Sequence, residues 1–538
     1  MKTPIRFILG LAFVFLAVIG PNSRAVVPPP DGGYPNFTTA EGQNALKSLT
    51  TGAGNTAAGW SALFTVTTGS LNTAVGAGAL ALNTGDGNTA TGADALLLNT
   101  TGIANTANGV FALFSNDSGN SNTALGNQAL SANTQGSFNT ATGSLALASN
   151  SAGSNNTAVG AGALESNTAD GNTAVGSAAL LFNTTGLDNT ATGFQALLSN
   201  ADGSRNTATG ARALSGNTGG TSNTATGIEA LSGNTTGNSN TAVGDSALNS
   251  NTTGSRNTAV GIAALQFNAD GNDNTAVGTS ALSTNMVGVG NSAIGSGALE
   301  ANTGDNNTAL GETALNGNGV GLQNTAVGHA ALLSNSSGTN NTAVGNVALL
   351  SSTGNGNTAL GSSAGINVTS ASNVICIGIP GQNVSNSCFI GNVFAATSTG
   401  GIGVLVNASG QLGTQTSSRR FKENVKSMER ASESLFALKP VSFRYKKEID
   451  PVGISQFGLV AEEVEKVNPD LIVRDDEGKP YSVRYDQVNA MLLNEFLKEH
   501  QKVNAQQKQI DALTMQLKQQ EARIQKISDR LSMTNGTL

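Results

Sequence analysis

The sequence predicts a mainly β protein, with a long parallel β-solenoid or β-roll array followed by a small α/β domain and a C-terminal coiled coil. The motif Asn-Thr-Ala-x-Gly, or a close variant, recurs every 16 or 17 residues between Asn55 and residue 367. Glycine is frequent, at 68 residues, and aromatic residues make up only 4% of the chain, so several thick cores are excluded. Of the 27 Lys and Arg residues, 20 follow residue 416, which separates a charge-rich segment from the array.

Residues 1–25 have the composition of a secretory signal peptide. Lys2 and Arg6 begin it, and Phe7 to Gly20 form an apolar run that is short for a membrane span. Small residues at Ser23 and Ala25 predict cleavage after Ala25, and an uncleaved membrane anchor is the alternative. We therefore expect export to the cell surface or the extracellular space, with no membrane span after signal removal. Residues 26–54, which are rich in Pro at their start, are expected to form an N-terminal lead-in.

Residues 55–367 are expected to form one coil of solenoid per repeat. Thr-Ala-Val alternates as a short strand does, Gly supplies a positive φ, Ala-Leu begins a second apolar element, and Asn-Thr-Thr-Gly favours a turn. We therefore expect two short strands and two turns per coil, with Ala, Val, Leu and Thr facing the core. Stacked Asn side chains should satisfy the turn backbones. The repeats begin at Asn55, Asn72, Asn88, Asn105, Asn122, Asn139, Asn156, Asn172, Asn189, Asn206, Asn223, Asn240, Asn257, Asn274, Asn291, Asn307, Asn324, Asn341 and Asn357.

One coil buries little apolar surface, so sharing of cores between chains in a homotrimer is expected. The Asn-Thr-Ala-Val-Gly unit resembles the Ser-Val-Ala-Ile-Gly unit of YadA-like trimeric adhesin heads, although the coil is longer here and the Asn-Thr pair is constant. That resemblance implies a trimeric head whose partner is a surface glycan or protein ligand. The regular Thr rows leave glycan or ice binding as an alternative. Residues 26–416 contain only four cations, Lys47, Arg205, Arg212 and Arg256, so nucleic-acid binding is not expected.

Residues 368–416 break the period and are expected to form a β-rich neck. This segment contains both cysteines of the chain, Cys376 and Cys388. They could pair in an oxidising compartment, or they could be two small residues packed in a strand region.

The hexapeptide Ser417-Ser418-Arg419-Arg420-Phe421-Lys422 marks the boundary between the array and the charge-rich segment. A Ser hydroxyl becomes a nucleophile when a base removes its proton, and a neutral Lys amine can be that base where burial disfavours the charged form. Ser417 is placed to reach the carbonyl group of Thr416, so the Thr416–Ser417 bond is the expected target of self-cleavage. The alternative is an exposed basic turn without catalysis.

Four motifs follow one another from this boundary: 416–425, 440–445, 457–464 and 483–485. Their order resembles the intramolecular chaperone auto-processing domain at the C-termini of phage tailspikes and endosialidases, over residues 417–500. The resemblance implies that the domain trimerises, assists folding of the upstream fibre and then cleaves itself off as a serine peptidase. Ser417 would be the nucleophile, Lys422 the base and Arg420 a supporting residue. That family usually has Asp after the Ser, where this chain has Ser418.

Residues 501–538 are expected to form a trimeric coiled coil, because apolar residues fall at the a and d positions of successive heptads. We therefore expect an exported trimeric fibre or adhesin-like protein that cleaves itself once and needs no cofactor and no metal. The alternatives are a phage-type tail fibre or tailspike and a solenoid enzyme that acts on carbohydrates, although the array's carboxylates are scattered rather than paired. The expected core residues of the coiled coil are Val503, Ile510, Leu513, Leu517, Ile524, Ile527 and Leu531.

Overall fold

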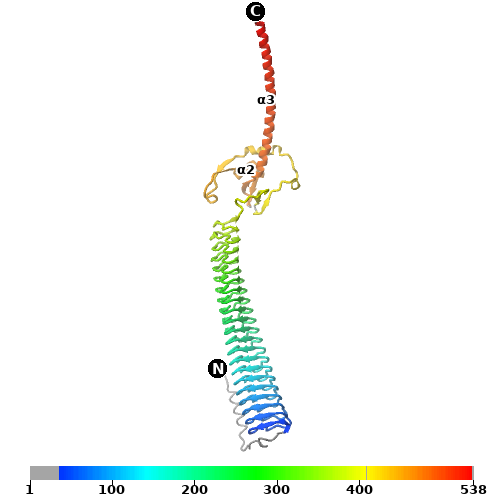
Figure 1. Ribbon diagram of the computed structural model, residues 1–538, viewed down its shortest axis with the longest axis vertical. Coiled ribbons are helices and arrows are strands. Elements are labelled where there is room, and N and C mark those ends of the chain that lie inside the picture. Colours follow the sequence, from blue (N-terminus) through cyan, green and yellow to red (C-terminus); the bar gives the residue numbers. More distant parts are fainter. Residues whose placement is uncertain (1–34, 408, 476, 536–538) are drawn as a thin grey trace. The chain divides into compact units, whose positions relative to one another are not determined.

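The computed structural model describes residues 35–407, 409–475 and 477–535, in two units that divide between Ala396 and Thr397 (Figure 1). The predicted signal peptide and the Pro-rich start of the lead-in lie outside the described residues. No helix among the described residues is both long enough and apolar enough to cross a membrane. Each unit is described separately below.

The first unit is a parallel β-solenoid in which each strand pairs with the strand one coil later, so the predicted fold class is confirmed. A single 3-10 turn, η1 (Pro35–Phe37), precedes the ladder. The strands are β1 (Thr39–Glu41), β2 (Thr56–Ala58), β3 (Thr73–Val75), β4 (Thr89–Thr91), β5 (Thr106–Asn108), β6 (Thr123–Leu125), β7 (Thr140–Thr142), β8 (Thr157–Val159), β9 (Thr173–Val175), β10 (Thr190–Thr192), β11 (Thr207–Thr209), β12 (Thr224–Thr226), β13 (Thr241–Val243), β14 (Thr258–Val260), β15 (Thr275–Val277), β16 (Ser292–Ile294), β17 (Thr308–Leu310), β18 (Thr325–Val327), β19 (Thr342–Val344), β20 (Thr358–Leu360), β21 (Val374–Ile377) and β22 (Ser387–Ile390).

The core of the array is built from Ala and Leu, which corrects the prediction that Val and Thr also face inward. In the coil of β14, Ala259 of the strand and Ala264 and Leu265 after it are fully buried. Val260 is 37% exposed, because the alternation of the strand turns it away from Ala259. The coil is therefore narrow, and small side chains fill it on the strand side.

The predicted second strand of each coil is a turn instead. Leu265 has a φ of 51°, in the left-handed region that L residues rarely adopt, and a Leu at the same place in the next coil, Leu282, has a φ of 53°. The N–H of Leu265 donates to the carbonyl of Ala281 in the next coil at 2.9 Å, so the hydrogen bond between coils holds this conformation. The Gly after the strand behaves as predicted: Gly261 has a φ of 134°, and a Cβ atom there would lie 2.6 Å from the carbonyl oxygen of Gly278.

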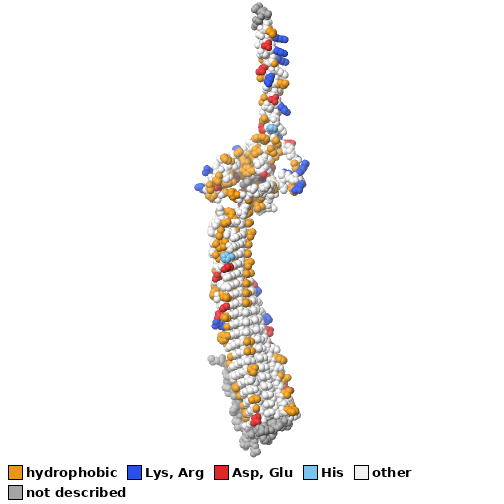
Figure 2. Space-filling view, viewed as in Figure 1, with side chains coloured by type: hydrophobic (Ala, Val, Ile, Leu, Met, Phe, Trp, Pro, Cys, Tyr) orange, Lys and Arg blue, Asp and Glu red, His pale blue; other side chains and the backbone are white. Residues whose placement is uncertain are grey.

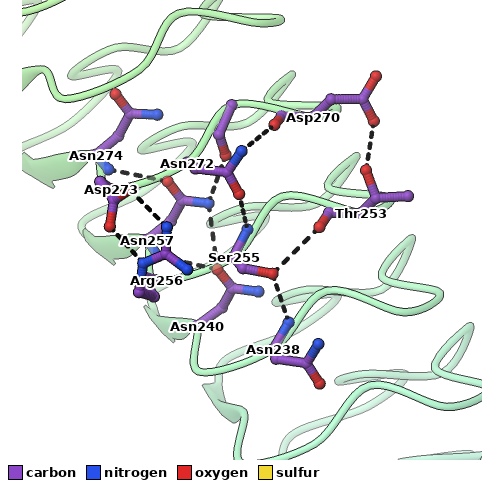
Figure 3. A network of polar contacts seen from close by, with 11 residues as sticks. Asn238, Asn240, Thr253, Ser255, Arg256, Asn257, Asp270, Asn272, Asp273 and Asn274 are labelled. Carbon is purple, nitrogen blue, oxygen red and sulfur yellow. Dashed lines mark hydrogen bonds and ion pairs between the residues drawn. The ribbon is translucent and has the colours of Figure 1, made fainter.

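Two columns of buried Asn side chains run the length of the array, as the sequence predicts. In the first column, the side-chain oxygen of Asn257 accepts from the N–H of Asn274 at 3.0 Å, and its amide group donates to the carbonyl of Gly271 at 2.8 Å (Figure 3). In the second column, the amide group of Asn268 donates to the side-chain oxygen of Asn251 at 2.7 Å and also to Gly271 at 3.0 Å. Each column therefore joins neighbouring coils and also closes its own turn.

A third, shallower column was not predicted. Near the end of many coils a Ser, Asn or Asp side chain accepts a hydrogen bond from the backbone N–H one coil earlier. The N–H of Asn238 donates to Ser255 Oγ at 3.0 Å, and the N–H of Ser255 donates to Asn272 Oδ1 at 2.8 Å (Figure 3). These short polar residues replace the backbone carbonyl that a continuous strand would have offered.

The parallel ladder extends beyond the predicted array at both ends. β1 begins at Thr39, inside the predicted lead-in, and β21 and β22 continue the sheet into the predicted neck. The register pairs Ile375 with Cys388, so the strand alternation places Cys376 inside and Cys388 outside. Cys376 is buried and Cys388 is exposed, and neither forms a disulfide.

The second unit is a small α/β domain followed by a long helix. Its core consists of Val464, Leu471, Ile472, Val483, Val488 and Met491, and much of its remaining apolar surface is exposed. β23 pairs with β24, β25 with β26 and β27 with β28, each antiparallel. The elements are β23 (Val404–Val406), β24 (Leu412–Thr414), η2 (Arg419–Phe421), η3 (Glu429–Ala437), β25 (Val441–Phe443), β26 (Gln456–Gly458), α2 (Ala461–Val467), η4 (Pro469–Leu471), β27 (Ile472–Arg474), β28 (Pro480–Val483) and α3 (Tyr485–Asn535).

Candidate functional site

A tight turn brings the ends of the boundary hexapeptide together. The N–H of Phe421 donates to the carbonyl of Ser418 at 3.0 Å, and the N–H of Lys422 donates to the carbonyl of Arg419 at 3.1 Å. Ser418 and Lys422 themselves have extended backbones on either side of η2. The chain therefore reverses over a few residues, and the side chain of Lys422 points back toward Ser417.

The Nζ atom of Lys422 lies 3.0 Å from Ser417 Oγ and donates a hydrogen bond to it. This separation is within the reach that a nucleophile and its base require. Both side chains are exposed to solvent in the single chain. Base catalysis requires the reverse direction of this hydrogen bond, in which the neutral amine accepts the hydroxyl proton.

Of the other predicted site residues, Arg420 packs within the turn and Thr416 directly precedes Ser417. The guanidinium group of Arg420 lies over the ring of Phe421, 4.6 Å from its centroid, so Arg420 packs on the turn rather than on Ser417. Thr416 is exposed, and no described residue donates a hydrogen bond to its carbonyl group. The described part of the chain therefore brings nucleophile and base together and shows no hydrogen bond to the carbonyl that they would attack.

A buried polar cluster in the second unit was missed by the sequence analysis. Ser432 in η3 is fully buried, donates to the carboxylate of Glu495 in α3 and accepts from the amide of Asn494 at 2.6 Å. Lys498 lies 2.6 Å from the same carboxylate. The Lys498 ammonium and the Ser432 hydroxyl both lower the pKa of Glu495. More than 60 residues separate the two elements, so no local sequence signal could have revealed a cluster that fixes η3 against α3.

The remaining titratable residues form no second site in the part of the chain that is described. No group of three or more His, Cys, Asp or Glu side chains there could hold a metal ion. Asp475 accepts from the N–H groups of Glu477 and Lys479 and so shapes the hairpin between β27 and β28. His500 stacks on Phe496 along α3, with 6.5 Å between the ring centroids.

Residues 417–473 match the family model of the chaperone of endosialidase, a peptidase family. The chaperone-of-endosialidase match begins at Ser417 and ends in β27, so it includes both members of the Ser–Lys pair and confirms the resemblance that the motifs indicated. No curated protein and no solved structure gives a significant match to this chain.

Proposed function

We propose that this protein is an exported, homotrimeric fibre of adhesin-like type, and that its C-terminal unit assembles the fibre and then cleaves itself off. A chaperone-of-endosialidase segment after a β-solenoid fits a tailspike-like or fibre-like protein. The observation that carries the proposal is the 3.0 Å contact between Lys422 Nζ and Ser417 Oγ at the first residue of the matched segment.

Assembly is supported by the apolar surface that the second unit leaves exposed. Phe457 is 86% exposed and Phe436 is 71% exposed, although both belong to the small domain that should have a core of its own. The predicted a and d residues of α3 are 53–65% exposed, from Ile510 at the low end to Ile524 at the high end. Exposed apolar patches of this kind mark surfaces that associate, and a heptad seam is buried when helices supercoil.

The contact between Lys422 and Ser417 supports the following course of cleavage. Ser417 Oγ attacks the carbonyl carbon of Thr416 while the neutral amine of Lys422 takes the hydroxyl proton. The same proton passes to the amide nitrogen of Ser417 as the peptide bond breaks, which leaves an ester between Thr416 and the Ser417 side chain. Water hydrolyses that ester and gives a Thr416 carboxylate and a new N-terminal Ser417. One peptide bond and one water molecule are consumed.

Association would control the timing of this reaction. In the single chain both side chains of the Ser–Lys pair are exposed to solvent. Burial of the pair between subunits would favour the neutral amine and would supply donors for the oxyanion. A fibre that has not assembled would therefore stay uncut.

Intact mass spectrometry of the expressed protein tests the cleavage. The wild type should give two pieces, one of which begins at Ser417. Ser417→Ala and Lys422→Ala should each give one uncut chain, whereas the neighbouring controls Ser418→Ala and Lys426→Ala should still be cut. Cleavage of both site variants at the Thr416–Ser417 bond would refute the assignment of the Ser–Lys pair.

Export is tested by the mature N-terminus of the protein. Cleavage after Ala25 would leave Val26 as the first residue and would support a surface or extracellular fibre over a phage-type fibre that assembles in the cytoplasm. Recovery of uncleaved Met1 from a secreting host would contradict cleavage after Ala25 and would favour the uncleaved membrane anchor.

A further inference from the structure

One side of the solenoid, formed by the outward residues of its strands, is uncharged and becomes apolar toward its C-terminal end. From β2 to β22 no strand residue is charged. In the ten strands from β13 to β22, the last residue is always Val, Leu or Ile. Eight of these ten residues are 37–51% exposed, which is high for aliphatic side chains in one unbroken row.

The strands nearer the N-terminus differ at the same position. Among β2 to β12, six of the eleven strands end in Thr or Asn instead. The fold needs no particular side chain there, because the position points out of the coil and the ladder continues without a change of register. The fold of the single coil therefore does not explain the aliphatic row, which begins at β13.

Polar residues border this side. Arg256 and Asp273 form an ion pair with 2.6 Å between Nε and Oδ1, and they stand just before β14 and β15 (Figure 3). Asp245 and Glu312 follow the Gly at the other end of their strands. An apolar centre with a polar border is the arrangement of a protein interface. In Figure 2, hydrophobic side chains form lengthwise rows on the visible face of the array, with few charged residues among them.

We propose that the strand side from β13 to β22 is the seam at which copies of this array meet in the assembled fibre. The proposal rests on the proposed trimer and identifies the surface that the array contributes to it. A rotation axis parallel to the solenoid places the same coil of each copy at the same height, so each aliphatic residue meets its own equivalent. An uncharged surface can face itself in this way without repulsion.

The full strand side, rather than its aliphatic strands alone, reaches the size of a stable interface. With strands about 4.8 Å apart and about 10 Å long, the full strand side covers roughly 1,000 Å² per copy. A stable interface buries about 800 Å² per partner. The ten aliphatic strands supply roughly half of that area, about 500 Å² per copy. They lie next in sequence to the second unit, whose heptad residues are also exposed. The aliphatic strands and the heptad residues of α3, which are both proposed to associate with other copies, therefore follow one another along the sequence.

Cys388 offers a native probe of the seam, because it is exposed at an outward position of β22 while Cys376 is buried. A short bismaleimide cross-linker is added to the self-cleaved fibre that is obtained by expressing the full-length chain. It should join copies through Cys388. Cys388→Ser should abolish the linked bands and Cys376→Ser should not. As a control, Ser337→Cys in the Cys388→Ser background places the thiol on an exposed turn away from the strands, and it should give no linked bands.

A matched pair of charge substitutions tests the position of the seam. Val277→Glu and Thr209→Glu change the last residue of β15 and β11, and both side chains are exposed, so the coil itself should fold in each. Light scattering on the cleaved array should show trimer for Thr209→Glu and monomer for Val277→Glu.

If the cleaved wild-type array is trimeric but Cys388 does not link and Val277→Glu has no effect, the seam is refuted while the proposed function stands. If the uncut Ser417→Ala protein is itself monomeric, the proposed function fails together with the seam.

Discussion

The buried Asn columns should be the most sensitive feature of the array, and Asn257→Ala tests one member. The side chain of Asn257 is fully buried and is the acceptor for the N–H of Asn274. Its truncation leaves that buried N–H without a partner, which costs about 1–3 kcal/mol, and removes one net hydrogen bond worth about 1 kcal/mol. The carbonyl of Gly271 keeps its bond from Asn268, so its loss adds little. We expect the array to lose about 2–4 kcal/mol.

Hydrogen exchange is the suitable assay, because a solenoid opens locally and its coils report separately. A loss of 2–4 kcal/mol should speed exchange at Asn274 by about 30-fold or more, since about 1.4 kcal/mol corresponds to a factor of ten. Asn127→Ala is the matched control, because the side chain of Asn127 is exposed and its amide makes a long contact of 3.5 Å with the carbonyl of Val110. If the two variants exchange alike in their neighbouring coils, the buried Asn column does not stabilise the fold as argued.

Three further outcomes are expected. Leu265→Ala should cost about 2–5 kcal/mol in guanidinium unfolding because it opens a cavity in a fully buried position, whereas Ile262→Ala, at 60% exposure, should change little. Glu495 has a pKa below its ordinary 4.5 because Lys498 and Ser432 favour the carboxylate, so its contribution to stability is present above that value and is lost as pH falls through the lowered pKa. In Glu495→Gln, the melting temperature of the second unit should therefore fall less than in the wild type as the pH is lowered from neutral to strongly acidic. Leu517→Asp should shift the uncut Ser417→Ala protein toward monomer in sedimentation.

The repeat period predicted most of the array, and particular residues show why the rest was missed. Alternation of Thr-Ala-Val predicts two faces but does not say which face is inside. The structure selects Ala259 over Val260, because a narrow coil has room for the smaller side chain on its strand side. The left-handed backbone of Leu265 could not be expected from a residue type that avoids it, since hydrogen bonds from the next coil impose it.

In the second unit too, the sequence predicted contacts between residues close in the chain and missed contacts between distant residues. Ser417 and Lys422 are five residues apart, so one turn brings them together and the motif alone predicted their contact. The burial that base catalysis requires is not a local property, and the hexapeptide carries no signal of it. Ser432 and Glu495 come together only because η3 packs against α3, and no periodicity relates them.

The coils of 16 and 17 residues share one register. Thr73 pairs with Thr89 across the shorter spacing as Thr56 pairs with Thr73 across the longer one. The missing residue is absorbed in the turn before the next strand, where Asn83 bonds to Gly85 two residues on, while Asn99 bonds to Gly102 three residues on. A whole coil can accordingly be duplicated or deleted by recombination between near-identical repeats without disturbing its neighbours. Each coil gained or lost would then change the length of the array by about 4.8 Å.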